Sequence, residues 1–202
     1  MMGISSPDFN AKDIRGTIVE SAELFASVIE DKDLQNKTQD TAELIIDTLK
    51  KGGKVLLCGN GGSAADAQHF AGEMVGSFLI KNRPGLAFIA LNTDTSVLTS
   101  IGNDRSYEEV FSQQTQALGR AGDVIIGIST SGNSKNIVRA FEQAAKMEMK
   151  LVAMCGASGK MSEMADIAMR VPCSSTPRIQ EVHALLIHII CGYVEAEMFK
   201  DA

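Results

Sequence analysis

The side chains best suited to chemistry lie in two stretches of the sequence. His69 and Glu73 are four residues apart in QHFAGE, a spacing that places them on one face of a helix, one turn apart. The second stretch, RIQEVHALLIH, contains Gln180 and His188. Histidine and glutamate transfer protons and bind zinc, whereas glutamine is a weak zinc ligand. Taken singly, His69 and Glu73 also fit a solvated helix pair, and His188 fits a buried core histidine.

A glycine-rich loop precedes the first of these stretches. Residues 59–62 (GNGG) follow an apolar run at residues 55–58, and a helix is expected from Ser63, a good N-cap residue. Glycine lets backbone amides approach a ligand closely, and a helix start presents unpaired N–H groups with a positive dipole end. The loop has neither the Walker A nor the GxGxxG pattern, so alone it fits an ordinary turn between a strand and a helix.

A second loop of this type strengthens the case for an anion site. Residues 129–134 (STSGNS) carry four hydroxyl side chains and follow an apolar run at residues 123–128. Amides, hydroxyls and a helix dipole are what a phosphate needs where no lysine is used. A single capping serine explains one or two of these hydroxyls and leaves the others unexplained.

Apolar runs alternate with amphipathic segments along the chain, which predicts an α/β fold. The runs are continuous, as in the strands of a parallel sheet covered by helices on both faces. Five strands are expected, at residues 55–58, 86–91, 123–128, 150–155 and 167–171. In such sheets ligands bind at the carboxyl ends of the strands, where both loops lie.

Two helices are expected before the first strand, over residues 9–30 and 34–49, after a loose tail of about eight residues. A simple strand–helix fold does not need them, so they pack on the sheet or against a partner chain. Later helices are expected from Ser63, from a cap at residues 92–94 through Ile101, and over residues 107–118, 135–147 and 178–199. Residues 102–104 are expected to break a helix, and residues 156–159 to form a loop.

The composition bounds the class of protein. A chain of 202 residues, 45% hydrophobic and 22% charged, suits a single domain over residues 1–202, with packing helices over 1–52 and an αβα core over 53–202. The net charge of −6 argues against general binding to nucleic acid or membranes. The four cysteines are scattered and the N-terminal residues lack an apolar signal segment, so a cytoplasmic protein with free thiols is expected.

Four stretches resemble the sugar isomerase (SIS) fold family, and within it the phosphoheptose isomerases. They are CGNGGSAADAQHFAGE (58–73), LNTDTSVLTSIGND (91–104), GDVIIGISTSGNS (122–134) and TPRIQEVHALLIH (176–188). The STSGNS loop is shared across SIS proteins, and HFAGE together with RIQEVHALLIH is the more specific signal. The resemblance covers residues 40–199 and implies a SIS-type three-layer αβα sandwich.

The resemblance also implies an activity and a set of site residues. The implied reaction converts sedoheptulose 7-phosphate to D-glycero-D-manno-heptose 7-phosphate, the first step toward ADP-heptose for bacterial lipopolysaccharide, in a homotetramer with active sites at subunit contacts. Glu73 and His188 are implied as the acid/base pair, and one zinc ion per subunit is implied on His69, Glu73, Gln180 and His188. The implied substrate contacts are Asn60, Gly61, Gly62, Ser63, Glu73, Asn103, Asp104, Ser129, Thr130, Ser131, Ser134 and Gln180.

Two features of the implied site conflict with simple geometry. A glutamate held tightly by zinc is a poorer base, so Glu73 exchanges between roles or binds the metal through one oxygen. Gln180 and His188 are separated by about 12 Å of rise in a continuous helix, so they do not easily meet on one metal. We therefore expect Gln180 at a frayed helix start, or one ligand from a neighbouring subunit. His183 is a rival ligand, but we expect it to be a partly exposed helix histidine.

Three other functions fit parts of the sequence. Some SIS proteins bind the bacterial replication initiator without known catalysis and share LNTDTSVLTSIGNDR, but they lack the glutamate that stands here at position 73. A sugar-phosphate sensor without turnover needs only the loops, and not the set His69, Glu73, Gln180 and His188. An isomerase for another phosphosugar is excluded least well, because pocket shape sets the sugar length.

Overall fold

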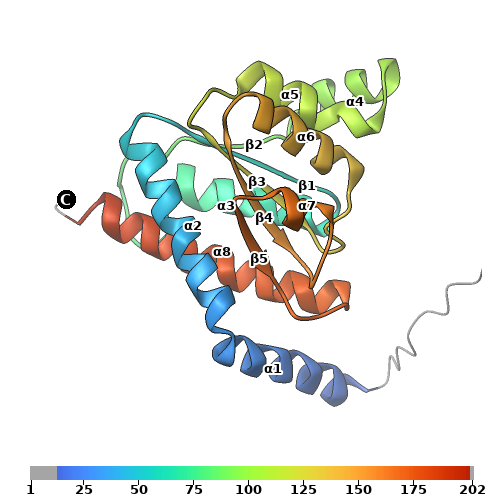
Figure 1. The fold of residues 1–202 in the computed structure, drawn as a ribbon. Coiled ribbons are helices and arrows are strands. Elements are labelled where there is room, and N and C mark those ends of the chain that lie inside the picture. The colour runs from blue at the N-terminus through green and yellow to red at the C-terminus, as the bar shows by residue number, and fades with distance from the viewer. Residues whose placement is uncertain (1–12, 201–202) are drawn as a thin grey trace, which may run out of the picture.

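The computed structural model describes residues 13–200, which build one parallel β-sheet with helices on both faces (Figure 1). The strands are β1 (Val55–Gly59), β2 (Phe88–Ala90), β3 (Val124–Ser129), β4 (Lys150–Cys155) and β5 (Ile167–Arg170). Their order is β2-β1-β3-β4-β5, and all neighbouring pairs are parallel. The predicted α/β class with five parallel strands is confirmed.

The helices alternate with the strands after an N-terminal pair. They are α1 (Ile14–Glu30), α2 (Lys32–Lys50), α3 (Gly62–Val75), α4 (Thr95–Asp104), the 3-10 turn η1 (Tyr107–Glu109), α5 (Val110–Leu118), α6 (Lys135–Lys146), α7 (Lys160–Met164) and α8 (Thr176–Met198). Within residues 13–200, no helix has both the length and the apolar character needed to cross a membrane.

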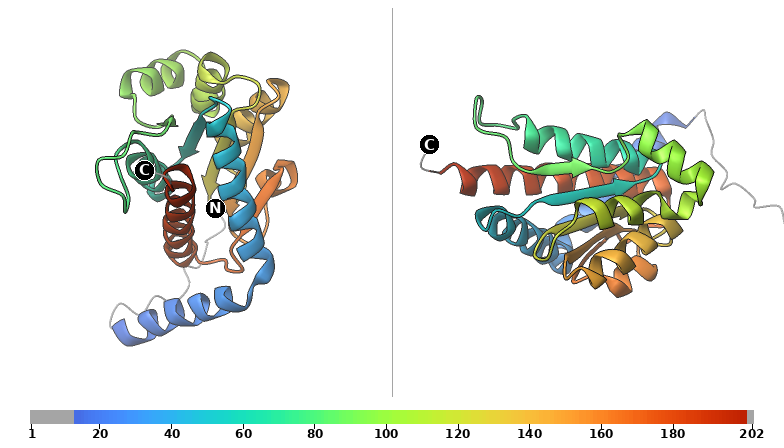
Figure 2. Two further views of the ribbon diagram at one scale, coloured as in Figure 1. Left: turned by 90° about the vertical axis from the view of Figure 1, so that its left-hand side faces the viewer. Right: turned by 90° about the horizontal axis from the view of Figure 1, so that it is seen from above.

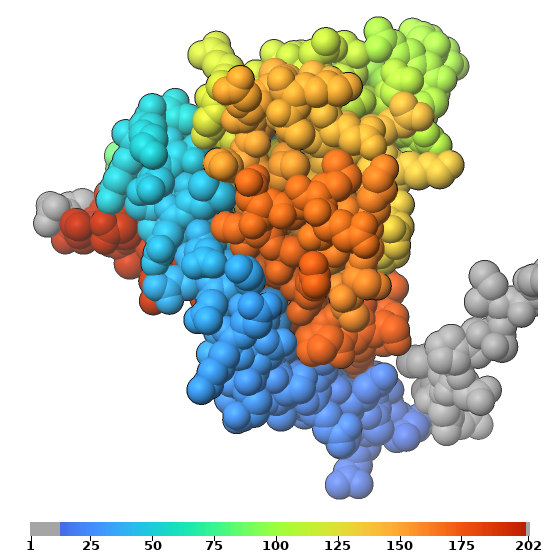
Figure 3. Space-filling view, viewed as in Figure 1, coloured from blue at the N-terminus to red at the C-terminus, as the bar shows by residue number. Residues whose placement is uncertain are grey.

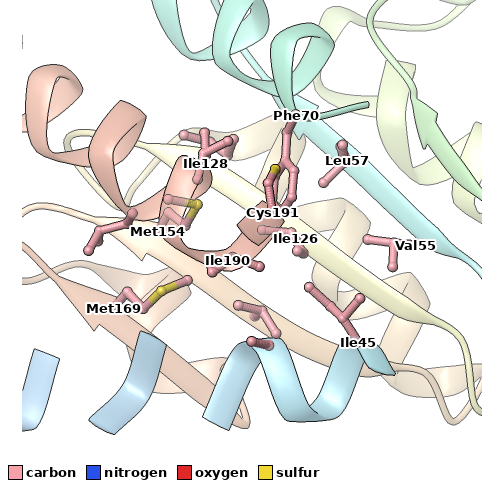
Figure 4. Packing of buried hydrophobic residues seen from close by; sticks show 14 of the residues in the cluster. Ile45, Val55, Leu57, Phe70, Ile126, Ile128, Met154, Met169, Ile190 and Cys191 are labelled. Atoms are coloured by element: carbon pink, nitrogen blue, oxygen red, sulfur yellow. The ribbon is translucent and has the colours of Figure 1, made fainter. Parts of the chain in front are cut away.

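Helices cover both faces of the sheet (Figure 2). Alternate residues of β1, β3 and β4 face opposite helix layers, so the sheet separates two hydrophobic cores. Val55 and Leu57 of β1 face the core formed with α2, α3 and α8, whose packing Figure 4 shows. Leu56 and Cys58 face the other core, formed with α5, α6 and α7. Burial on both faces explains why the strands read as continuous apolar runs. Phe70 of α3 is fully buried in the first core, and its truncation to alanine would cost about 3–5 kcal/mol.

The α1 helix stands away from the sheet, at the edge of the molecule (Figure 3). Val28 is its one buried residue, whereas Ile14, Ile18 and Ile29 are 72%, 63% and 70% exposed. Apolar side chains gathered on one exposed helix are typical of a surface that contacts another protein.

Two expected helix boundaries are wrong. Ser63 does not cap α3; Gly61 occupies the N-cap position, and Ser63 lies buried inside the helix. Residues 102–104 do not break α4, which starts after its N-cap Asp94 as expected but continues through Gly102 to Asp104. A single glycine costs a helix only about 1 kcal/mol, which the flanking turns of α4 tolerate.

Two other expectations need correction at their edges. The second strand is shorter than residues 86–91, because β2 pairs with β1 only from Phe88 to Ala90. The helix α7 follows the loop at residues 156–159 and was not expected; it is a single turn, too short to show a period in the sequence. The expected tail and the first residues of the 9–30 helix lie outside the described residues.

Candidate active site

The α3 and α8 helices lie side by side and run in the same direction, so their successive turns meet. Gln180 of α8 lies against Gly62 at the start of α3, where a Cβ atom on the glycine would be 2.4 Å from the Gln180 Nε2 atom. Two turns further along, the Nε2 atoms of His69 and His188 are 2.8 Å apart, with the rings edge to face. The helix pair therefore brings together the two stretches singled out in the sequence.

Glu73 extends this cluster on the other side of the His69 ring. Its Oε1 atom lies 3.6 Å from His69 Nδ1, and the two side chains are 24% and 43% exposed. His188 is also exposed, so it is not the core histidine that its apolar neighbours in the sequence allow. The structure thus places one carboxylate and two imidazoles, the groups most often used for proton transfer, in a cluster that a ligand can reach from solvent.

Gln180 is separated from His188 by two turns of regular helix. It is the fifth residue of α8, which begins at Thr176, so the expectation of a frayed helix start around Gln180 is wrong. Eight residues of helix span about 12 Å, and Gln180 accordingly meets the glycine loop while His188 meets His69. Within one subunit these two side chains serve different parts of the site.

The donors of the cluster fit zinc by type. Imidazole nitrogens and a carboxylate oxygen are ordinary zinc ligands. In their present orientation, however, no three histidine, cysteine, aspartate or glutamate side chains of residues 13–200 form a group that could hold a metal ion. The reason lies at His69, because Glu73 and His188 approach opposite nitrogens of its ring.

The glycine loop needs glycine at two positions. A Cβ atom at Gly59 would be 2.2 Å from the Ser63 carbonyl oxygen, so a side chain there would push the start of α3 away from β1. Gly61 has φ of 56°, in the left-handed region that favours glycine, and the space around its α-carbon is open. The first amides of α3 therefore stand at the edge of the sheet without a side chain at residue 61, and the Gln180 side chain lies against Gly62.

The amide of Asn60 is held in one orientation within this loop. Asn60 and Asn136 exchange two hydrogen bonds, with lengths of 3.0 and 2.9 Å. The hydroxyl of Tyr107 donates a third, of 3.1 Å, to Asn60 Oδ1. Asn136 and Tyr107 were not predicted as site residues, and the sequence gives no signal for them, because the contacts join three distant segments.

The serine loop between β3 and α6 forms its own network. The Ser129 hydroxyl lies 2.9 Å from that of Ser134 and 3.4 Å from that of Ser131. Ser134 is the N-cap of α6, but its side chain makes no capping bond. The first two amides of the helix, those of Lys135 and Asn136, therefore stay available to an anion, whereas the Ile137 amide donates to Asn136 Oδ1 at 3.0 Å. The Thr130 hydroxyl points away from this group, toward Thr176 at the start of α8, at 3.4 Å.

Asn103 and Asp104 lie apart from the predicted site residues described above. Both are exposed at the end of α4, and the Asn103 amide donates a hydrogen bond of 2.8 Å to Asp104 Oδ1. Among the described residues, neither has a hydrogen bond to α3, α8 or the serine loop. The connection to the site in this part of the chain is made by Tyr107, three residues after Asp104, which donates to Asn60.

Two titratable groups near the cluster differ from expectation. His183 is fully buried rather than partly exposed, with Nε2 3.4 Å from the Cys155 carbonyl oxygen, and burial lowers its pKa to about 4. It faces the sheet and cannot serve as a ligand beside His188. Burial raises the pKa of Asp66 to about 6, an effect that His69 partly offsets. Asp66 was not singled out in the sequence, since nothing there distinguishes it from a surface aspartate.

Comparisons with known proteins identify the family. A model of the SIS domain matches residues 19–156. The chain is 53% identical to a phosphoheptose isomerase of Helicobacter pylori over 163 residues, 80% of this chain and 84% of the relative. It is 49% identical to that of Sulfurimonas denitrificans over 191 residues, 94% of this chain and 97% of the relative.

Comparison with a solved structure supports the same family. The phosphoheptose isomerase of Neisseria gonorrhoeae superimposes with a TM-score of 0.85 at 45% identity, covering 91% of this chain and 97% of that chain. The fold and the paired helices define a SIS-domain protein, and the chain belongs to the phosphoheptose isomerases, a family of SIS-domain enzymes.

Proposed function

We propose that this enzyme converts sedoheptulose 7-phosphate to D-glycero-D-manno-heptose 7-phosphate through an enediol. The observation that carries the proposal is the open cluster of Glu73, His69 and His188 beside two loops suited to a phosphate. The substrate class follows the names of the relatives, which are phosphoheptose isomerases. The reaction would be the first step toward ADP-heptose and lipopolysaccharide, in the cytoplasm.

The loops would hold the substrate. The phosphate is bound by the first amides of α6 and by the hydroxyls of Ser129, Ser131 and Ser134. The hydroxyl of Thr130 joins them when it turns away from Thr176. The sugar chain is oriented by the glycine loop, through the backbone groups of Gly61 and Gly62. Polar side chains around the loop also contribute, namely Asn60, Ser63, Gln180, Asn103 and Asp104. Binding energy from the remote phosphate then serves to position C1 and C2 against the acid/base groups.

Glu73 and His188 would move the protons. One of them takes the proton from C1 and returns it to C2, while the other transfers the protons of the two oxygens. His69 lies between them and fixes their separation. Oriented amide groups of Asn60 and Gln180 stabilise the negative oxygen of the enediolate.

Zinc is proposed as the cofactor, one ion per subunit. His69, Glu73, Gln180 and His188 would hold it, and the chemical types of these donors support this set. When bound, zinc supplies a Lewis acid for the substrate oxygens. Glu73 must turn away from His69 Nδ1 to take part.

We further propose a homotetramer with active sites at subunit contacts, packed through residues 1–52. The apolar face of α1 and a groove lined by Phe25, Ile29, Leu185, Ile189 and Tyr193 support a partner on this side of the molecule. The two turns of helix between Gln180 and His188 support a site that takes these residues from different subunits. Neither a nucleic acid nor a membrane is proposed as a partner.

A substrate series tests the proposal. The purified enzyme, treated with chelator, would be offered ketose phosphates of five, six and seven carbons, with and without added zinc. We expect the highest kcat/KM for sedoheptulose 7-phosphate, and activity that zinc restores. Equal rates on all three sugars would refute the substrate assignment, and full activity without metal would refute the zinc assignment. Absence of turnover in the folded enzyme would favour initiator binding or sugar-phosphate sensing instead.

A further inference from the structure

The segment between α3 and β2, residues 76–85, is organised by one buried carboxylate. Glu195 of α8 accepts hydrogen bonds from three consecutive backbone amides, those of Phe78 (3.0 Å), Leu79 (2.6 Å) and Ile80 (2.8 Å). These bonds replace the regular secondary structure that the segment lacks. The segment is thereby fixed to the C-terminal half of α8.

Arg83 closes this arrangement from the other side. Its Nε atom lies 2.5 Å from Glu195 Oε1, and both side chains are 1% exposed. Its two terminal nitrogens donate to the carbonyl oxygens of Glu73 (2.7 Å) and Met74 (2.9 Å) in the last turn of α3, where carbonyls lack intrahelical partners. The Met74 carbonyl also accepts from the Leu86 amide, at 3.0 Å. One buried ion pair therefore joins the end of the helix that carries Glu73 to the helix that carries His188.

The Arg83–Glu195 pair and its hydrogen bonds place Phe78 beside the candidate active site. Its ring stacks on the imidazole of His188, with 5.6 Å between centroids and 16° between planes. Gly192, one turn further along α8, lies beside the ring, and a Cβ atom there would be in ordinary van der Waals contact with Phe78 Cε1, at 3.7 Å. The His188 ring is thus held between Phe78 on its face and His69 at its Nε2 atom.

We propose that Phe78, fixed by the Arg83–Glu195 pair, is a positioning residue that sets the ring orientation of His188. The inference rests on the proposed function, in which His188 moves protons. A side chain that only filled space could be replaced by any apolar side chain of similar volume. A positioning residue needs a flat ring at this place, because only a plane defines the plane of the imidazole.

The test compares Phe78→Leu, which keeps apolar volume, with Phe78→Tyr, which keeps the ring. Leu79→Ala is the matched control, since Leu79 is the next residue and is 72% exposed. We expect kcat for sedoheptulose 7-phosphate to fall about 10- to 100-fold in Phe78→Leu, with KM and the melting temperature nearly unchanged. Phe78→Tyr and Leu79→Ala should keep the kcat of the wild type. Wild-type kcat in Phe78→Leu would overturn the proposal, as would an equal loss in Phe78→Tyr.

A second readout does not depend on activity. The chain has three histidines, so the ring signals of protein labelled with ¹³C-histidine are few. Loss of the stacked ring in Phe78→Leu should shift the His188 signals and leave those of the buried His183 in place. Unshifted His188 signals would contradict the inference even in an active enzyme. If the wild type does not convert sedoheptulose 7-phosphate, the proposed function is refuted. A shift of the His188 signals between the wild type and Phe78→Leu would still support the positioning role in that case.

Discussion

Burial decides which of the three histidines can take part in chemistry. His69 and His188 face each other at an exposed position, whereas His183 is sealed against the end of β4, with a pKa of about 4. The sequence offers all three at similar helical positions and cannot rank them. The sequence therefore supplies three candidate histidines, and their burial in the fold decides which of them a substrate can reach.

The buried His183 and the half-buried Asp66 predict opposite effects of pH on stability. The folded pKa of His183 lies below its usual 6.5, so the unfolded chain takes up a proton first and stability falls as the pH drops from 6.5 to 4. The folded pKa of Asp66, about 6, lies above its usual 3.8, so stability rises as the pH drops through the same range. The wild type should show a nearly flat profile between pH 4.5 and 6.

Two variants separate these effects. For His183→Leu, the free energy of unfolding should rise as the pH falls from 6 to 4.5. For Asp66→Asn it should fall, by up to about 3 kcal/mol over the full His183 range. Denaturant titrations at fixed protein concentration measure both. Parallel profiles of the wild type and the two variants would contradict the prediction. Burial raises the pKa of Glu195, but Arg83 and the three backbone amides lower it more, to below 4.5. Glu195 therefore affects the free energy of unfolding only below the pH range of this test.

At the scale of the elements, two parallel helices and two loops build the site. The strands and long helices could be predicted because burial on both faces leaves continuous apolar runs, as in Lys150–Cys155, which matches the expected bounds. The pairing of α3 with α8 could not be derived from periodicity, since no local signal says which helices lie side by side. The contacts of Phe78 with His188 and of Tyr107 with Asn60 could not be predicted for the same reason, because they join segments far apart in the chain.

Two glycine substitutions, at the end of β1 and within α3, test how closely the glycine loop is packed. Gly59→Ala places a Cβ atom 2.2 Å from the backbone oxygen of Ser63, which cannot yield without moving the helix, so we expect a loss of about 1–3 kcal/mol. Gly72→Ala, within α3, meets no atom within 4 Å and should be neutral or slightly stabilising. Thermal and denaturant unfolding measure the stability of the two variants. Equal stabilities would contradict the prediction and show that the loop moves to accept the added methyl group.

At the scale of the whole molecule, the residues proposed for the site do not all meet within one subunit. Gln180 lies at the glycine loop, His188 lies two turns away, and Asn103 and Asp104 are exposed on α4. An oligomer can bring such parts together where a single chain cannot. The exposed apolar face of α1 offers a surface for this association.

Mixed subunits test the shared site. Gln180→Ala and His188→Ala homomers should both be inactive. Oligomers that contain both subunits, isolated with two different tags, should recover about a quarter of the wild-type activity, because some sites then combine an intact Gln180 with an intact His188. No recovery in oligomers shown to be mixed would mean that the two residues act within one chain.

The central claim is that Glu73 and His188 move a carbon-bound proton of sedoheptulose 7-phosphate. The most direct measurement is proton NMR of this sugar phosphate with the zinc-loaded enzyme in D₂O, beside Glu73→Gln. We expect the wild type to form the aldose phosphate, with deuterium at C2 in the fraction of turnovers in which the base exchanges its proton with D₂O before returning it, and the variant to be slower by about 10²–10⁴-fold. An unchanged sugar spectrum with the folded wild type, or equal conversion by both proteins, would contradict it.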